Sequence, residues 1–335
     1  MKKCAIVLFL IAFITCKTDS PKIYKNVNRG PALGTSYSII YLSDKELDYQ
    51  IAIDSVFAVI NQSMSTYIPT SDISRVNKGD TTVVVDAMFK NVFELSSSVY
   101  KATDGYFDPT IGSLVNAWGF GPGKRVALDS VKVDSILKYV GFSKVNITST
   151  NKIKKLYPNI YFDFNAIAKG YTLDRLAKLL DAKGITNYLV ELGGEIVAKG
   201  ENTIKKKPWV VGIDDPEGEN RNMPKVLLNI KDRALASSGN YRKFRIDEAT
   251  GEKYVHTVNP KTGYTKNSSV LAATVVANNC AIADAYATSF MAMDLEDSKK
   301  LLYQNTTLDA FIIYLDKKGE TQQFMTGGFQ KMVVK

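Results

Sequence analysis

Histidine is nearly absent from this chain of 335 residues: it occurs once, as His256. Imidazole is the side chain whose ordinary pKa lies closest to neutral pH, so a single copy has either no role or one specific role. Cysteine is scarce as well, with three residues, Cys4, Cys16 and Cys280. If export removes the N-terminus and Cys16 is acylated, Cys280 has no partner. An internal disulfide is then excluded, and the core must hold the fold.

Two glycine motifs that commonly cradle phosphates are also missing. No GxGxxG follows an expected strand and no GxxxxGK(S/T) occurs, which argues against Rossmann and P-loop sites. The net charge is +9, yet the basic runs at 152–156 and 204–209 lack interleaved aromatic residues. They fit solvated loops near an anionic membrane surface, and we expect no nucleic-acid partner.

The apolar run at the N-terminus, from Cys4 to Ile14, is too short to cross a bilayer, which takes roughly 20 residues. With Lys2 and Lys3 before it, the run has the length and flanks of a secretory signal. It ends near Cys16, where the chain turns polar at once, and this favours a lipoprotein signal with a relaxed lipobox. An ordinary signal peptide, or an N-terminal anchor with Cys16 incidental, is the alternative. Acylation of Cys16 would hold the protein on a membrane surface without a transmembrane helix.

Helices and strands are grouped along the chain rather than alternating one by one. Apolar spacing predicts helices over 43–64, 87–102, 129–141, 165–184 and 279–305. Strands are expected over 34–42, 159–164, 187–199, 208–214, 224–230, 242–246, 252–258 and 270–277, and a closing hairpin over 308–326. This grouping indicates an α+β protein with mainly antiparallel sheets packed with helices, not a Rossmann or P-loop fold. We expect a signal peptide over 1–15, a lipidated polar tether over 16–30 and a folded domain over 31–335.

Two stretches carry residues suited to a planar, negatively charged ligand. Residues 103–123, TDGYFDPTIGSLVNAWGFGPG, combine glycines with aromatic rings, so the backbone can approach a ligand and the rings can stack on it. An ordered loop that packs its own aromatics would have the same composition. In FDFNAIAKG, 162–170, Asp163 ends an expected strand, Asn165 caps the next helix and Lys169 lies one turn inside it. A helix N-terminus beside a lysine favours a phosphate, and an Asp163–Lys169 surface pair is the alternative.

Two further stretches carry candidate metal-binding and catalytic groups. Asp284 and Thr288 lie four residues apart on an expected helix, on one face and among alanines. Such oxygen ligands suit Mg2+, although an aspartate bonded to backbone amides of a neighbouring loop would give the same pattern. Residues 237–240, SSGN, are expected as a polar turn that offers N–H groups to an anion. His256 follows on a later strand, as either a structural residue or a catalyst.

Taken together and in order, these stretches resemble the FAD:protein FMN transferase (ApbE-type flavin transferase) family. The matching motifs are LGTSYSI near the start, STYIPTSDISRVN (65–77), DGYFDPTIGSLVNAWGFG (104–121), DFNAIAKGYTLDRLA (163–177), YLVELGGEIVAKG (188–200), ALASSGNYRKF, YVHTVNPKTGY, ADAYATSFM (283–291) and TGGF (326–329). The resemblance covers about residues 30–330 and implies an ApbE-like (T-fold-like) architecture.

The resemblance implies that the protein binds FAD with Mg2+ and transfers the FMN half to a threonine or serine hydroxyl of an acceptor flavoprotein, releasing AMP. It implies FAD contacts at Leu33, Tyr67, Tyr106, Phe107, Asp108, Asp163, Lys169 and Val258. It places Mg2+ at Asp284, Thr288 and the backbone oxygen of Ala166, and a catalytic base at His256. It also implies an exported protein that Cys16 anchors to a bacterial membrane, facing the periplasm. The acceptor would be a membrane redox subunit or secreted flavoprotein with a Ser/Thr-containing motif.

Several positions depart from the common pattern of that family. Leu33 replaces a frequent methionine, and Glu195 stands where aspartate is usual. Cys280-Ala281-Ile282 occupies a region where some relatives carry another carboxylate, so we expect water to complete the metal shell. Two other functions remain open for the same residues: hydrolysis of FAD to FMN and AMP, and flavin binding by a lipoprotein without chemistry.

Overall fold

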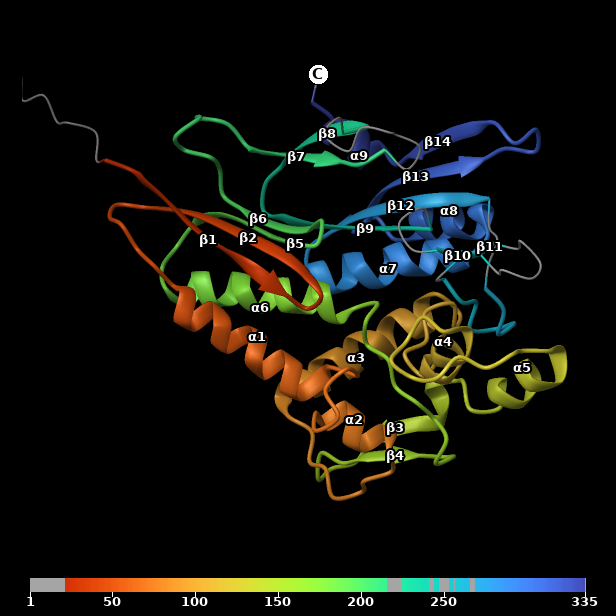
Figure 1. Cartoon of the computed structure of the whole chain (residues 1–335). Coiled ribbons are helices and arrows are strands. Elements are labelled where there is room, and N and C mark those ends of the chain that lie inside the picture. The colour runs from red at the N-terminus through yellow and green to blue at the C-terminus, as the bar shows by residue number, and fades with distance from the viewer. Residues whose placement is uncertain are drawn as a thin grey trace, which may run out of the picture.

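An eight-stranded antiparallel sheet lies at the centre of the molecule (Figure 1). The computed structural model describes residues 22–215, 224–240, 244–246, 253–255, 257–265 and 269–334. The strands of the sheet, in spatial order, are β1 (Tyr24–Ala32), β2 (Thr35–Ser43), β5 (Asn187–Leu192), β6 (Glu195–Lys199), β9 (Arg233–Gly239), β12 (Val270–Ala277), β13 (Asp309–Leu315) and β14 (Thr321–Met325). Every neighbouring pair is antiparallel, which confirms the predicted α+β class.

The sheet is covered on both faces. Figure 1 shows helices α1, α3, α6 and α7 on one face and the β7–β8 ribbon with α9 on the other. The helices are α1 (Gln50–Met64), α2 (Asp72–Asn77), α3 (Ala87–Ala102), α4 (Gly112–Trp118), α5 (Ser130–Leu137), α6 (Ala168–Ala182), α7 (Cys280–Ala292), α8 (Leu295–Gln304) and α9 (Gly327–Met332). The described residues also form short two-stranded ribbons: β3 (Val145–Ile147) with β4 (Ile153–Lys155), β7 (Trp209–Ile213) with β8 (Val226–Ile230), and β10 (Phe244–Ile246) with β11 (Lys253–Val255). In the part of the chain that the structure describes, no helix has the length and apolarity needed to cross a membrane.

The central strand β9 shows how two cores share one sheet. Ala234 and Ala236 face the helices and belong to the larger core, whereas Leu235 faces the ribbon and belongs to the smaller one. All three side chains are buried. Because successive side chains of a strand point to opposite faces, a central strand between two layers is apolar on both sides. The sheet is therefore a rigid platform, and its strand ends can position the groups at its margin.

The first strand corrects the predicted tether. Residues 24–30, placed in the tether from their polar composition, belong to β1, which pairs with β2 along its whole length. The inward positions of β1 are the buried Asn26 and Asn28 instead of apolar residues. Asn26 Nδ2 donates to Ser43 Oγ at 2.7 Å, and Asn28 Nδ2 donates to Asp48 Oδ1 at 2.7 Å. The side-chain amides of these buried asparagines are hydrogen-bonded, as buried polar groups must be. The sequence of the strand therefore lacks the alternation of apolar and polar residues that predicts a strand.

Two other local predictions were wrong near the candidate site. Residues 159–164 form no strand; Tyr161 makes only an isolated bridge to Ile111. Residues 237–239 lie in β9 and not in a turn. The reason in the second case is tertiary: residues 237–239 pair with residues 272–274 of β12, and this pairing outweighs the turn preference of Ser and Gly.

Candidate active site

The candidate site begins where helix α6 meets helix α7. Gly170, in the first turn of α6, donates its N–H to Asp284 Oδ2 of α7 at 3.2 Å. Asp284 is buried, and burial raises its pKa, while Lys169 and the Gly170 amide lower it. A Cβ at position 170 would lie 2.3 Å from the Cys280 carbonyl oxygen, so only glycine permits this approach. The two helices are therefore held in a fixed relation at the predicted metal residue.

The same hydrogen bond affects the backbone of Ala166. The predicted cap Asn165 is wrong, because α6 starts at Ala168 after Ile167, which makes no side-chain cap bond. An N–H in a helix ordinarily donates to the carbonyl four residues earlier. Among the described residues, the Gly170 amide bonds to Asp284 and not to Ala166. The Ala166 carbonyl oxygen, which the family resemblance implies as a metal ligand, therefore accepts no hydrogen bond from the Gly170 amide.

Lys169 forms an ion pair with Glu195, the first residue of β6. The Glu195 side chain is 2% exposed. Burial raises the pKa of Glu195 to about 8; the Asp284 carboxylate adds to this rise and Lys169 opposes it. For Lys169, burial lowers the pKa, but the Glu195 and Asp284 carboxylates outweigh burial and raise it overall. Two buried carboxylates therefore share one ammonium, which belongs to a side chain that is 36% exposed.

Thr288 lies one helical turn after Asp284 and faces the sheet. Its Oγ1 is 3.3 Å from Ser238 Oγ, on the helix-facing side of β9. Asn240 follows β9, and Thr257 Oγ1 donates to Asn240 Oδ1 at 2.8 Å. His256 itself lies outside the described residues, as does Cys16. The residues on either side of His256, Val255 and Thr257, are described and are buried. Thr257 bonds to Asn240 just after β9, and Thr288 bonds to Ser238 at the same end of that strand.

Asp163 and Tyr67 are brought together by the tertiary structure. Asp163 lies in the turn before α6, where its Oδ1 accepts the Asn165 N–H at 2.8 Å. Burial raises the pKa of Asp163. The Tyr67 side chain is 61% exposed, and its pKa is raised by partial burial and by the Asp163 carboxylate. An exposed ring beside a buried carboxylate is suited to stacking on a planar ligand.

The Tyr106-Phe107-Asp108 turn places only its first side chain toward the surface. Phe107 and Asp108 are buried. Asp108 Oδ1 accepts the N–H and the hydroxyl of Thr110, at 2.8 and 2.6 Å, and Oδ2 accepts the Phe142 N–H at 3.0 Å. Burial raises the pKa of Asp108 to about 6, against these hydrogen bonds. The Asp108 carboxylate is therefore used in fixing the loop.

The glycine- and aromatic-rich loop packs against the stretch that follows His256. Lys261 Nζ lies 4.3 Å from the centre of the Tyr106 ring and 2.6 Å from Asp104 Oδ2. Trp118 Nε1 donates to the Gly263 carbonyl at 2.8 Å. Val258 is buried in a small core with Trp118. The loop also reaches the start of α6, because the Asp163 N–H donates to the Pro109 carbonyl at 2.8 Å.

Leu33 lies at the sheet margin, in the tight turn between β1 and β2. Its φ of 49° is left-handed, as the turn requires. Gly193, in the next turn along the sheet, donates its N–H to the Ser36 carbonyl at 3.1 Å. A Cβ on Gly193 would lie 2.9 Å from Thr35 Cγ2. The Leu33 turn thus lies beside the turn that leads into Glu195.

The sequence prediction of site residues missed Glu195 and Asp174. Asp174, on α6, accepts the first two amides of α7, from Cys280 at 2.7 Å and Ala281 at 2.9 Å. Burial raises the pKa of Asp174 to about 6, against these two bonds. A carboxylate directly after a double glycine was a usable signal for Glu195. Asp174 gave no such signal, because its partners are more than one hundred residues away in sequence.

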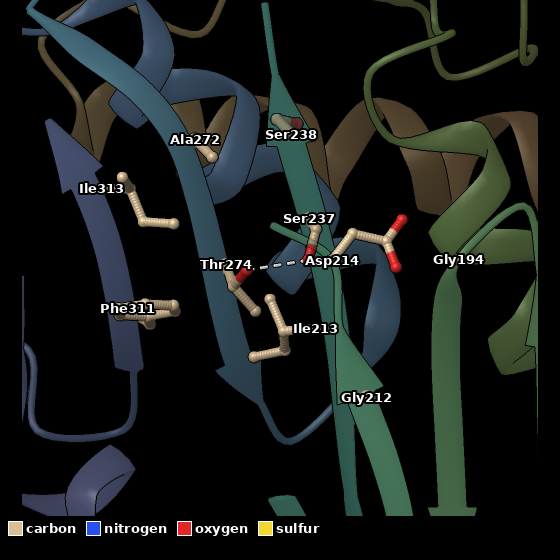
Figure 2. Close-up of a pocket in the computed structure, with 10 residues that line it drawn as sticks. All are labelled: Gly194, Gly212, Ile213, Asp214, Ser237, Ser238, Ala272, Thr274, Phe311 and Ile313. Atoms are coloured by element: carbon tan, nitrogen blue, oxygen red, sulfur yellow. Dashed lines mark hydrogen bonds between the residues drawn. The ribbon is translucent and has the colours of Figure 1, made fainter. Parts of the chain in front are cut away.

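Two hollows in the described part of the protein lie apart from the predicted FAD residues. A cavity of about 50 Å³ lies on the ribbon side of the sheet. Figure 2 shows the side chains that line it, among them Ser237 and Thr274, whose hydroxyl oxygens are 2.8 Å apart. The cavity is large enough for water and far too small for a dinucleotide. A second hollow of about 750 Å³ lies between α3, α6 and β6, and contains none of the predicted site residues.

The residues present fit a hard cation. In the described ranges, no cluster of three or more His, Cys, Asp or Glu side chains is arranged to hold a metal ion. The groups around the Gly170–Asp284 bond are instead carboxylates, the Thr288 hydroxyl and the Ala166 carbonyl. Such an oxygen-only set matches the preference of Mg2+, whereas Zn2+ prefers nitrogen and sulfur ligands.

Known proteins give an independent comparison. The profile of the ApbE family matches residues 33–312. The FAD:protein FMN transferase of Haemophilus influenzae is 31% identical over 317 residues, covering 90% of each chain. The Vibrio cholerae protein of that name is 33% identical over 297 residues, covering 86% of each chain. The solved structure of flavin transferase ApbE from Vibrio cholerae superposes with a TM-score of 0.81 at 30% identity, over 93% of this chain and all of that one. The family match includes Lys169, Glu195 and Asp284, and this chain therefore belongs to the ApbE family.

Proposed function

We propose that this chain transfers the FMN half of FAD to a threonine or serine hydroxyl of an acceptor flavoprotein and releases AMP. Family membership and the names of its relatives support the reaction class. The observation that carries the proposal is the charged cluster at the start of α6, where the partly exposed Lys169 meets the buried Glu195 and Asp284. A cluster of this kind suits the diphosphate of FAD together with a cation.

In this proposal Asp284, Thr288 and the Ala166 carbonyl hold Mg2+. Three features support these roles: the Ala166 carbonyl accepts no bond from Gly170, Asp284 is buried, and the Thr288 hydroxyl faces the sheet. When bound, Mg2+ would neutralise charge on the diphosphate oxygens. The Lys169 ammonium would add a second positive charge at the same diphosphate.

FAD would lie across the loops that converge on this cluster. Tyr67 offers an exposed ring, and Leu33 offers an apolar contact from the adjacent turn. Asp163 is near enough to Tyr67 for its carboxylate to raise the pKa of the tyrosine. The Asp108 carboxylate and the Phe107 ring are buried inside the protein, so FAD contacts from residues 106–108 would come from the Tyr106 ring and the backbone. Val258 would pack against this loop through Trp118.

The chemistry requires a base, a positioned phosphorus and a stabilised leaving group. His256 would remove the proton of the acceptor hydroxyl, whose oxygen then attacks the phosphorus of the FMN half. The bond from that phosphorus to the bridging oxygen breaks, and AMP leaves with the charge. A base with a pKa near neutral typically contributes 10²–10⁴-fold to such a step.

A labelling assay tests this function. The purified chain is incubated with FAD, Mg2+ and a candidate acceptor flavoprotein, and the acceptor is analysed by intact mass. We expect a covalent FMN adduct and one AMP per adduct. Free FMN with AMP and no adduct would show FAD hydrolysis, and bound FAD without AMP would show a flavin carrier.

Replacement of the histidine tests its role as the base. We expect His256→Ala to lower the rate of FMN transfer by about 10²–10⁴-fold while FAD binding, measured by flavin fluorescence, stays as in the wild type. A parallel fall in FAD affinity would make His256 a structural residue.

We also propose that Cys16 is acylated and anchors the protein to a bacterial membrane facing the periplasm. The support comes from the sequence, namely the short apolar run and the abrupt polar junction. Its acceptor would then be a membrane redox subunit or a secreted flavoprotein with a Ser/Thr-containing motif.

A further inference from the structure

Glu195 has one oxygen that the protein leaves unused. Its Oε1 accepts a hydrogen bond from Lys169. Its Oε2 is buried and accepts no hydrogen bond from any residue that the structure describes. A buried carboxylate oxygen without a partner is costly, because it has lost water and gained nothing in return. Such an atom indicates a binding site, because a bound ligand would supply the missing partner.

The surroundings of Oε2 point to a cation as that ligand. Glu195 lies on the helix-facing side of β6, and the neighbouring Asp284 carboxylate raises its pKa. Lys169 is the cation that approaches both carboxylates among the described residues. Without a cation, burial and the Asp284 carboxylate raise the pKa of Glu195. When both carboxyl groups are ionised, the single ammonium leaves one negative charge uncompensated. A divalent cation, joined by the diphosphate of FAD, would compensate it.

The position of Glu195 is fixed before any ligand binds. It follows the Gly193–Gly194 turn, and Gly194 donates its N–H to Glu191 Oε1 at 2.7 Å. Ion pairing with Lys169 holds its other oxygen. Preorganised oxygens of this kind suit Mg2+, which demands near-ideal geometry.

We propose that Glu195 Oε2 is an additional oxygen ligand of the Mg2+ site, supplied by the sheet and opposite Asp284, while Oε1 stays bonded to Lys169. The inference rests on the proposed metal-dependent transfer. It changes the expectation that water alone completes the metal shell, because α7 offers Asp284 and Thr288 and the sheet offers Glu195.

The first test measures metal binding without activity. Mg2+ affinity is measured by calorimetry on the purified chain without FAD, and Mn2+ binding by its electron paramagnetic resonance signal. We expect Glu195→Gln to raise the Kd for both ions about tenfold or more. Glu201→Gln is the matched control, because Glu201 forms a comparable pair with Lys231 at the surface, and it should bind both ions as the wild type does.

A lysine variant separates a metal ligand from a residue that merely anchors Lys169. If Glu195 is a ligand, Lys169→Met should keep or increase Mg2+ affinity, since it removes a competing cation. It should also show a larger rise in Tm on adding MgCl2 than the wild type. If Glu195 acts only through Lys169, Lys169→Met should weaken Mg2+ binding as Glu195→Gln does, and the inference is overturned.

The double variant Lys169→Met/Glu195→Gln covers the case in which Glu195→Gln does not fold, because it leaves no unpaired ammonium. We expect it to bind Mg2+ as weakly as Glu195→Gln; wild-type affinity in it would refute the inference. Wild-type protein that binds Mg2+ through Glu195 but labels no acceptor would refute the proposed function alone. Normal transfer with unchanged affinity in Glu195→Gln would refute the inference alone.

Discussion

Gly170 allows helices α6 and α7 to approach each other closely. Alanine at this position would favour helix by about 1 kcal/mol in isolation. In the folded protein its Cβ would lie 2.3 Å from the Cys280 carbonyl oxygen and 2.8 Å from the Ala281 nitrogen, and backbone atoms cannot rotate away. We expect Gly170→Ala to lower the free energy of unfolding by about 2 kcal/mol or more, measured by urea denaturation.

Gly327→Ala is the matched control for that substitution. Gly327 is also at the start of a helix, α9, and a Cβ there would meet no atom within 4 Å. We expect this variant to be neutral or slightly more stable. Equal destabilisation by both substitutions would contradict the packing explanation.

Asp108 makes stability depend on pH in a defined direction. Burial raises its pKa from 3.8 to about 6 in the folded protein. Between these values the folded state binds more protons than the unfolded state, so the contribution of Asp108 is present below about pH 4 and is lost as pH rises through 6. The loss corresponds to about 3 kcal/mol.

The variant Asp108→Asn isolates this contribution. We expect its free energy of unfolding, relative to the wild type, to increase as pH rises from 4 to 6, measured by urea denaturation at each pH. Asp80→Asn should show no such trend in this window, because hydrogen bonds from Thr82 lower the pKa of Asp80 to about 2. Parallel pH profiles for wild type and Asp108→Asn would rule out the raised pKa.

At the scale of elements, α7 is positioned by a residue of another helix. Asp174 accepts the two leading amides of α7, which have no partner within that helix. Asparagine offers one acceptor oxygen instead of two. We expect Asp174→Asn to cost about 1–2 kcal/mol of stability and to weaken Mg2+ binding, because Asp284 and Thr288 move with α7. Denaturation and a Mg2+-dependent thermal shift would measure the two effects.

Asp129→Asn provides the comparison for that variant. Asp129 caps α5 by accepting the Lys132 N–H at 2.8 Å, far from α7 in the fold. Asparagine is also a good N-cap residue. We expect little change in stability and none in Mg2+ binding. A Mg2+ thermal shift that stays normal in Asp174→Asn would show that α7 is held in place by packing alone.

At the scale of the whole molecule, the site lies at one end of the strands of the sheet, and the N-terminal strand β1 is an edge strand of that sheet. Among the described strands, β1 pairs only with β2, and Cys16 precedes β1 in the sequence. We expect Cys16→Ser to move the expressed protein from the membrane fraction to the aqueous phase of a detergent partition, while its FMN transfer rate with a soluble acceptor is unchanged. Retention of Cys16→Ser in the membrane fraction would favour an uncleaved N-terminal anchor.

Local patterns in the sequence predicted much of the element content. The helix at 87–102 and the hairpin at 308–326 were predicted correctly, because apolar spacing and turn residues are local signals. β1 and the start of α6 were not. Buried asparagines replace apolar residues in β1, and the first turn of α6 is completed by Asp284 from a distant helix.

The sequence by itself determined the kinds of chemical group available: one imidazole, an Asp–Thr pair at helical spacing, a lysine near a helix start, and the ordered motifs of the ApbE family. Only the tertiary structure decided which groups meet. Lys169 pairs with Glu195 and not with Asp163, and Asp284 bonds to Gly170. The physical reason is that charge and burial act through space. Partners separated by 26 and 114 residues leave no local pattern, and they become neighbours only when the helices pack on the sheet.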